Sequence, residues 1–123
     1  MPSPTEDSHL SHLKDSTPGA GASGVTVECC LSCNVVTGAA SYATHPIRQF
    51  VDAGILVTLN PDDPVRICTT IGREYAIAAA LGFARPELLA FTRTAFQASF
   101  TTAERKTALL GTLRDWAARS SLP

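Results

Sequence analysis

Two short apolar runs separated by a helix-like segment constrain the fold of this chain more than any other feature. Residues 25–31 form a run rich in β-branched side chains, and residues 55–59 (Ile-Leu-Val-Thr-Leu) are almost wholly apolar. An apolar strand without polar alternation is typical of a strand that is covered on both faces in a parallel sheet. Between the two runs, Pro46 suits the first position of a helix and Gly54 suits the residue after its end. The order strand, helix, strand predicts a βαβ unit with a right-handed crossover.

Three further helices are predicted after the second strand. The first spans residues 69–81 and ends at Gly82, and the second opens at Pro86. The third starts at Thr101, which has capping-box spacing to a glutamate three residues later. The apolar stripe of this last helix consists of Leu109, Leu113 and Trp116. The stripe predicts that the tryptophan packs in the core, and the whole pattern predicts an α/β fold.

The first 24 residues differ in composition from the rest of the chain. They are rich in Gly, Pro, Ser and Thr, and their only large apolar pair is Leu10 and Leu13. Such a segment buries too little apolar surface to offset the entropy of ordering it. We therefore expect a flexible N-terminal segment over residues 1–24 and a folded part over residues 25–119.

Two strands are too few for the sheet that this sequence implies. A buried parallel pair leaves the outer edge of each strand unpaired, and further strands are needed to cover those edges. The chain supplies no further strand-like run. We therefore expect a piece of a larger α/β structure, or a chain that associates with a partner or with itself through its strand edges.

Charge and hydropathy exclude several classes of function. The 123 residues hold 10 Lys and Arg against 11 Asp and Glu, for a net charge of −1, which does not suit binding to nucleic acid through bulk positive charge. No apolar stretch approaches the roughly 20 residues that span a bilayer, and the acidic N-terminus does not resemble a secretory signal. We expect no nucleic-acid partner, no membrane and a cytoplasmic location.

Polar chemistry is concentrated where the second apolar strand ends. Asn60 and Pro61 lead into two adjacent carboxylates, Asp62 and Asp63, followed by Pro64. The carboxyl ends of buried parallel strands are where α/β folds place their functional residues. The same residue types also form ordinary turns, so the pair by itself leaves both interpretations open.

Three motifs occur in order along the chain, at residues 27–34, 45–54 and 57–64, and together they resemble motifs of the adenosine deaminase family. Residues 27–34 (Val-Glu-Cys-Cys-Leu-Ser-Cys-Asn) resemble the Glu-x-Cys-Pro-x-Ser-Asn motif of the seventh strand of that family, and residues 45–54 are similar to the helix that follows it. Residues 57–64 (Val-Thr-Leu-Asn-Pro-Asp-Asp-Pro) resemble its eighth strand with the Asp-Asp-Pro motif, which is the most specific match. Thr69-Thr70 with Glu74-Tyr75, and residues 95–100, resemble the closing helices. The likeness covers about residues 25–118.

The resemblance implies a fold, a reaction and two site residues. The fold is the C-terminal fragment of a TIM (β/α)8 barrel, consisting of strands 7 and 8 with their following helices. Asp62 would be a carboxylate ligand of a catalytic Zn²⁺, and Asp63 would hydrogen-bond the purine ring at N7. The reaction would be hydrolytic deamination of a 6-aminopurine to the 6-oxo purine and ammonia, with a metal-bound hydroxide as nucleophile. Adenosine is the first choice of substrate, and adenine and AMP remain open.

The rest of the catalytic set of that family is missing. It includes a His-x-His, a further His with a Glu proton shuttle, and another His. The only histidines here are His9, His12 and His45, at positions that do not match. A catalytic zinc normally has three protein ligands, and a TIM barrel needs about 250 residues. We therefore expect no deaminase turnover by this chain alone. Smaller departures are Leu31, Cys33 and Pro61, where the family usually has Pro, Ser, and Thr or Ser.

Two alternatives of other classes remain. Cys30 and Cys33 form a Cys-x-x-Cys pair directly after a strand, as in thiol redox modules or half of a zinc site. Residues 34–38 are a poor helix start, whereas a redox pair requires a helix that begins at its first cysteine. The second alternative is a catalytically dead interaction fragment that docks on a partner chain through its strand edges.

Overall fold

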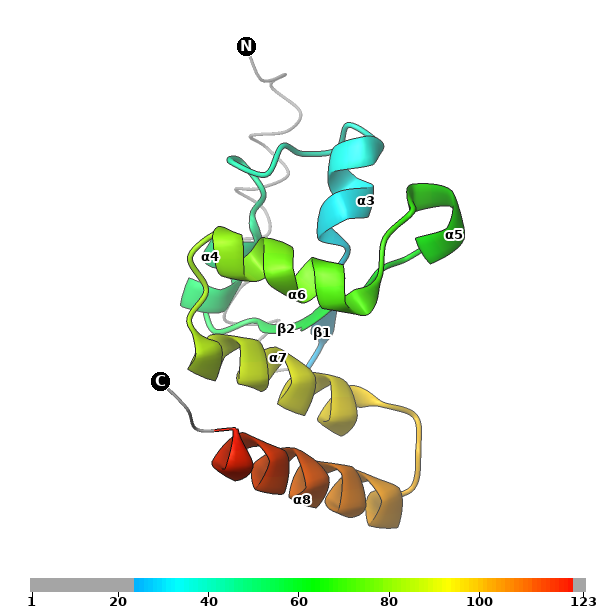
Figure 1. Cartoon of the computed structure of the whole chain (residues 1–123), viewed down its shortest axis with the longest axis vertical. Coiled ribbons are helices and arrows are strands. Elements are labelled where there is room, and N and C mark those ends of the chain that lie inside the picture. The colour runs from blue at the N-terminus through cyan, green and yellow to red at the C-terminus, as the bar shows by residue number, and fades with distance from the viewer. Residues whose placement is uncertain (1–23, 121–123) are drawn as a thin grey trace.

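The computed structural model describes residues 24–120 and contains the predicted βαβ unit. Strands β1 (Thr26–Cys29) and β2 (Leu56–Leu59) pair in parallel, with Thr26 opposite Leu56 and Cys29 opposite Leu59. Two short helices, α3 (Leu31–Val36) and α4 (Ile47–Asp52), connect them (Figure 1). The predicted N-terminal segment lies outside the described residues, apart from Gly24.

The helices begin and end near the proline and glycine residues expected from the sequence. Pro46, predicted at the first helical position, is instead the N-cap of α4, one residue earlier. Gly54 after the end of α4 has a φ of 79°, a left-handed conformation that glycine adopts at little cost. After β2 come α5 (Pro64–Ile67) and α6 (Ile71–Ala80). Gly82 follows α6 with a φ of 102°. The predicted ends at Gly54 and Gly82 are confirmed.

The last two helices, α7 (Arg85–Ala98) and α8 (Ala103–Arg119), lie side by side in opposite directions (Figure 1). The predicted cap of α8 at Thr101 is wrong by one residue. Thr102 is the N-cap, and its hydroxyl accepts a hydrogen bond of 3.2 Å from the backbone N–H of Arg105. A threonine on either side of the helix start satisfies the same sequence pattern, and only the backbone geometry decides between them.

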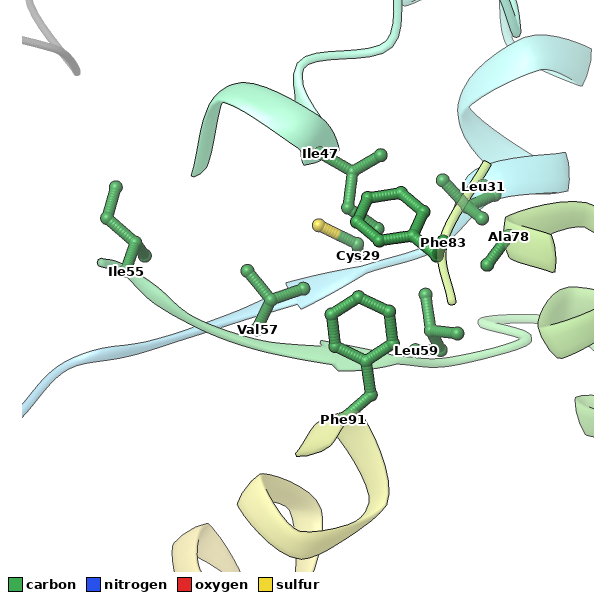
Figure 2. Close-up of a cluster of buried hydrophobic side chains, with 9 residues drawn as sticks. All are labelled: Cys29, Leu31, Ile47, Ile55, Val57, Leu59, Ala78, Phe83 and Phe91. Atoms are coloured by element: carbon green, nitrogen blue, oxygen red, sulfur yellow. The ribbon is translucent and has the colours of Figure 1, made fainter. Parts of the chain in front are cut away.

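The core lies between the sheet and the helices that pack on it. Figure 2 shows Ile47 of α4 and Phe91 of α7 on either side of Val57, with Phe83 beside them. The rings of Phe83 and Phe91 meet edge to face, with their centroids 5.3 Å apart. The complete buried set is Cys29, Leu31, Ile47, Ile55, Val57, Leu59, Ala78, Phe83 and Phe91. The βαβ unit and the helices after it therefore share one core.

The expectation of a strand covered on both faces holds for the last three of the four residues of β2. Val57, Thr58 and Leu59 are all buried, and successive strand residues point to opposite faces. Leu56 at the start of β2 is exposed, as is Glu28 in β1. The described sheet has only these two strands, so each strand keeps one unpaired edge.

The predicted core position of Trp116 is wrong. No residue of α8 is buried, and 49% of the Trp116 surface is exposed. The apolar stripe of α8 instead lines an open hollow of about 520 Å³ between α6, α7 and α8, with Leu109 and Leu113 beside the tryptophan. The predicted apolar stripe lies on one face of α8, but α8 packs on another helix at the edge of the molecule and not on the sheet.

Candidate functional site

The chain leaves β2 directly into the candidate site. The backbone N–H of Asn60 donates to the carbonyl oxygen of Cys29 at 2.9 Å, which extends the strand pairing by one residue. The Asn60 side chain turns back and donates to the hydroxyl of Thr58 at 2.8 Å. These bonds fix the carboxyl end of the sheet, and the two predicted site residues follow at once.

Asp62 adopts a left-handed backbone conformation that directs its side chain toward α3. Its φ is 61°, which non-glycine residues adopt at a cost of about 1–2 kcal/mol and which Asp tolerates better than most. One carboxylate oxygen, Oδ2, accepts a hydrogen bond from the thiol of Cys33 at 3.0 Å. Asp62 is otherwise exposed. The turn therefore brings together residues from the ends of both strands.

Asp63 is the N-cap of α5. Its Oδ1 accepts a hydrogen bond of 3.2 Å from the backbone N–H of Arg66, an ordinary capping arrangement. The carboxyl group is half-buried, whereas Arg66 is exposed and meets Asp63 through its main chain. The two adjacent aspartates thus occupy different environments, one against a thiol and one at a helix start.

The thiols do not have the properties of a redox pair. Contrary to expectation, α3 does begin at the pair, with Cys30 as its N-cap. However, the hydrogen bond to Asp62 raises the pKa of Cys33 to about 11, and burial, followed by the charge of Asp62, raises the pKa of Cys30. A reactive thiol needs a lowered pKa. Burial also raises the pKa of Cys29 to about 12, and all four cysteines are free.

A buried glutamate near the strand ends was not predicted as a functional residue. Glu74 on α6 has no exposed surface. Its Oε2 accepts from the backbone N–H of Ser32 at 3.2 Å, and its Oε1 accepts from the hydroxyls of Ser32 and of Thr69, the latter at 2.8 Å. The only signal in the sequence is that Glu74 and Thr69 lie in a stretch that resembles the closing helices of the deaminase family.

His45 is committed to structural hydrogen bonds. Its Nδ1 accepts from the backbone N–H of Ile47 at 3.1 Å, so Nε2 carries the proton and donates to Oδ1 of Asn34 at 2.9 Å. Burial lowers the pKa of the ring. Both ring nitrogens are thus engaged within the chain, which leaves none for a metal. His9 and His12 lie outside the described residues.

The residues that the structure describes do not complete a zinc site. Over residues 24–120 no group of three His, Cys, Asp or Glu side chains could hold a metal ion. Asp62 offers one carboxylate, and a catalytic zinc normally takes three protein ligands. A metal at Asp62 would therefore need ligands in addition to those described here.

Comparison with known protein families shows to which family this chain belongs. The family profile for adenosine deaminase matches residues 19–116. The chain belongs to the adenosine deaminase family. The predicted resemblance is therefore confirmed, with both aspartates inside the matched range.

Curated relatives within this family are adenine deaminases. The chain is 41% identical over 92 residues to the adenine deaminase of Rhizobium leguminosarum bv. trifolii, which is 73% of this chain and 29% of that protein. It is 42% identical over 93 residues to the adenine deaminase of a Chelativorans species, which is 74% of this chain and 29% of that protein. The chain thus spans less than a third of the length of these relatives.

Solved structures of deaminases share the fold. The adenine deaminase of Arthrobacter aurescens matches with a TM-score of 0.79 and 25% identity, over 85% of this chain and 32% of that one. Arabidopsis ADAL, solved in complex with IMP, matches with a TM-score of 0.77 and 25% identity, over 99% of this chain and 40% of that one. The α/β piece described here is thus similar to part of a larger deaminase fold. No helix over residues 24–120 has both the length and the apolar character needed to cross a membrane.

Proposed function

We propose that this chain forms strands seven and eight of a deaminase barrel, in which Asp62 supplies one ligand of a catalytic Zn²⁺ and Asp63 binds the purine ring. The observation that supports this most directly is the turn after β2. The family motif, the left-handed φ of 61° at Asp62 and the contact with Cys33 coincide at the carboxyl end of a parallel pair. Functional residues of TIM barrels lie at this end of the strands.

The two carboxylates suit two different roles. Asp62 is exposed, and its one hydrogen bond within residues 24–120 comes from the thiol of Cys33, a neutral donor that leaves its charge available to a cation. Asp63 is anchored by the backbone N–H of Arg66 at Oδ1, so its carboxyl group has a fixed orientation. Fixed orientation is what a group that recognises one ring nitrogen requires.

The remaining ligands must lie outside residues 24–120. The chain spans about 29% of its curated relatives, and its described residues offer one carboxylate where zinc needs at least three ligands. We propose that the chain acts only together with the polypeptide that carries the other strands and the histidines of the barrel, and that alone it does not deaminate purines.

We propose a 6-aminopurine as substrate, with adenine tested first. The motifs of the sequence favour adenosine, whereas the relatives about 40% identical to this chain are adenine deaminases. Adenine therefore precedes adenosine and AMP in the order of testing. The contacts that distinguish a free base from a nucleoside or a nucleotide would come from strands outside residues 24–120.

A chimera tests the proposal. Residues 25–119 replace the matching segment of the Rhizobium leguminosarum adenine deaminase, and ammonia release is followed with adenine, adenosine and AMP. We expect activity in the chimera and a loss of at least about 100-fold in Asp62→Asn, since a ligand of a catalytic metal contributes several kcal/mol. Asp63→Asn should also lose activity, and Asp115→Asn on the exposed side of α8 is the matched control. A folded chimera in which Asp62→Asn retains full activity refutes the role of Asp62.

A second candidate function, docking on a partner chain, is supported by the open edges of the sheet. β1 and β2 form the whole described sheet, and unpaired edges favour pairing with another chain. We expect the isolated chain to self-associate, which sedimentation velocity measures over a range of concentrations. A monomer at every concentration with a cooperative unfolding transition contradicts this function.

A further inference from the structure

A buried carboxylate without a cationic partner joins three segments near the strand ends. Glu74 is fully buried, and none of the ion pairs among residues 24–120 involves it. Burying a carboxyl group is costly unless hydrogen bonds compensate it. Here Ser32 donates to both of its oxygens and Thr69 donates to one. Glu74 is therefore satisfied entirely by the two short segments that it links to α6.

Both of these segments adjoin Asp62. Ser32 precedes Cys33, the residue whose thiol contacts the Asp62 carboxylate at 3.0 Å. Thr69 follows Cys68, the left-handed residue with a φ of 56° that ends α5. α5 in turn begins immediately after the two aspartates. One carboxyl group thus fixes the start of α3 on one side of Asp62 and the exit of α5 on the other.

We infer that Glu74 is a positioning residue for Asp62. It holds the first turn of α3 against α6 and, through the thiol of Cys33, keeps the Asp62 carboxylate at the carboxyl end of the sheet. The functional meaning of this role rests on the proposed function, in which Asp62 binds a metal. The geometry itself involves no metal and no purine, so it can be tested without either.

The network depends on acceptors at both side-chain oxygens of Glu74. Glu74→Leu removes both acceptors and leaves the backbone N–H of Ser32 and the hydroxyls of Ser32 and Thr69 without this partner. The start of α3 must shift to relieve this loss, and the contact between Cys33 and Asp62 shifts with it. Glu74→Gln is the conservative variant, because its amide oxygen can accept from the backbone N–H of Ser32 while its N–H₂ group donates to the two hydroxyls, which accept as well as donate.

The test is a spectroscopic signature at Asp62 in the full 123-residue chain. The chain is labelled with ¹³C at the aspartate carboxyl carbons, and the Asp62 resonance is assigned by its disappearance in Asp62→Asn. We expect Glu74→Leu to move or broaden this resonance by several line widths while the circular dichroism spectrum stays native, and Glu74→Gln to leave it closer to its native position. Glu104→Gln, a substitution at an exposed glutamate in the first turn of α8, is the matched control and should leave the resonance in place.

Two results overturn the inference. The first is an unmoved Asp62 resonance in folded Glu74→Leu, which would make Glu74 a stabilising residue only. The second is a native chain without a distinct Asp62 resonance, because a network that fixes Asp62 must do so in this chain. If Glu74→Leu does not fold, Thr69→Val decides by the same readout, since it removes one donor and keeps the side-chain shape. A folded chimera in which Asp62→Asn retains full activity, while Glu74→Leu still moves the Asp62 resonance, refutes the proposed function and leaves this inference standing.

Discussion

Removing the charge of Asp62 should make the thiol of Cys33 more reactive. The Asp62 carboxylate accepts a hydrogen bond from the protonated thiol and repels the thiolate, and both effects favour the protonated form. Together with burial they raise the pKa of Cys33 from 9.0 to about 11. Asp62→Asn keeps an oxygen acceptor of the same size but removes the negative charge. The pKa should therefore fall toward 9.0, and more thiolate should be present at any pH below it.

The size of the effect follows from two opposing terms. At pH 8.5 a fall in pKa from about 11 to about 9 raises the thiolate fraction by roughly 75-fold. A less basic thiolate is also a weaker nucleophile, and with a Brønsted coefficient of about 0.45 the same fall costs about eightfold in intrinsic reactivity. The net gain in alkylation rate is up to about tenfold, because burial keeps part of the original shift in place.

The assay is alkylation of the folded chain by iodoacetamide at pH 8.5, read at Cys33 by tandem mass spectrometry. Asp63→Asn is the matched control, because it removes a charge one residue away that makes the smallest contribution to the raised pKa of Cys33 and forms no hydrogen bond with the thiol, and asparagine is an equally good helix cap. We expect Asp63→Asn to change the rate less than twofold. Equal rates at Cys33 in the native chain and in Asp62→Asn would show that thiol and carboxylate are not in contact in solution, and would refute the geometry of the site.

Three further predictions concern the scaffold and are checked by urea denaturation followed by circular dichroism. Phe91→Ala should lower the free energy of unfolding by about 3–5 kcal/mol, because Phe91 is buried edge to face against Phe83; a loss below about 1 kcal/mol contradicts this packing. Thr102→Ala should lower the free energy of unfolding by about 1 kcal/mol through loss of the α8 cap, whereas Thr101→Ala should lower it little. The reverse order would show that Thr101 is the cap. Because the pKa of His45 is lowered in the folded chain, this residue binds a proton more readily when the chain is unfolded. Stability should therefore fall as the pH drops below about 6.5, and this fall should be smaller in His45→Gln; an equal fall in both would show that the ring is not buried neutral.

The sequence predicts the parts of this fold that depend on local chemistry. Gly54 and Gly82 end helices because their backbone conformations are left-handed, and the apolar run of β2 is buried over its last three residues. Such features can be predicted from composition and periodicity, because the features depend on neighbours along the chain. The end of the apolar run also places the two aspartates, and the family resemblance added the roles expected of them, which no periodicity identifies.

Other features depend on contacts between distant segments, and the sequence could not supply them. Glu74 lies 42 residues from Ser32, so nothing near either residue indicates that they meet. Trp116 has the spacing of a core residue, yet residues of α4, α6 and α7 fill the core, and α8 contributes no buried residue. The low helix propensity of residues 34–38 does not predict α3, which begins earlier, at Leu31, where burial and the hydrogen bonds of Ser32 to Glu74 stabilise it.

The exposed tryptophan has a practical consequence for any optical study of this protein. The chain contains a single tryptophan, which lies on α8 at the rim of the hollow and has half of its surface in solvent. Its emission reports the surroundings of the last helix and not those of the β-sheet core. A fluorescence melt would follow α8 as it leaves α7, whereas an ellipticity melt would follow all the helices. A gap between the two midpoints would measure how independently the last helix detaches, and a blue shift on adding another polypeptide would show that the hollow had been covered.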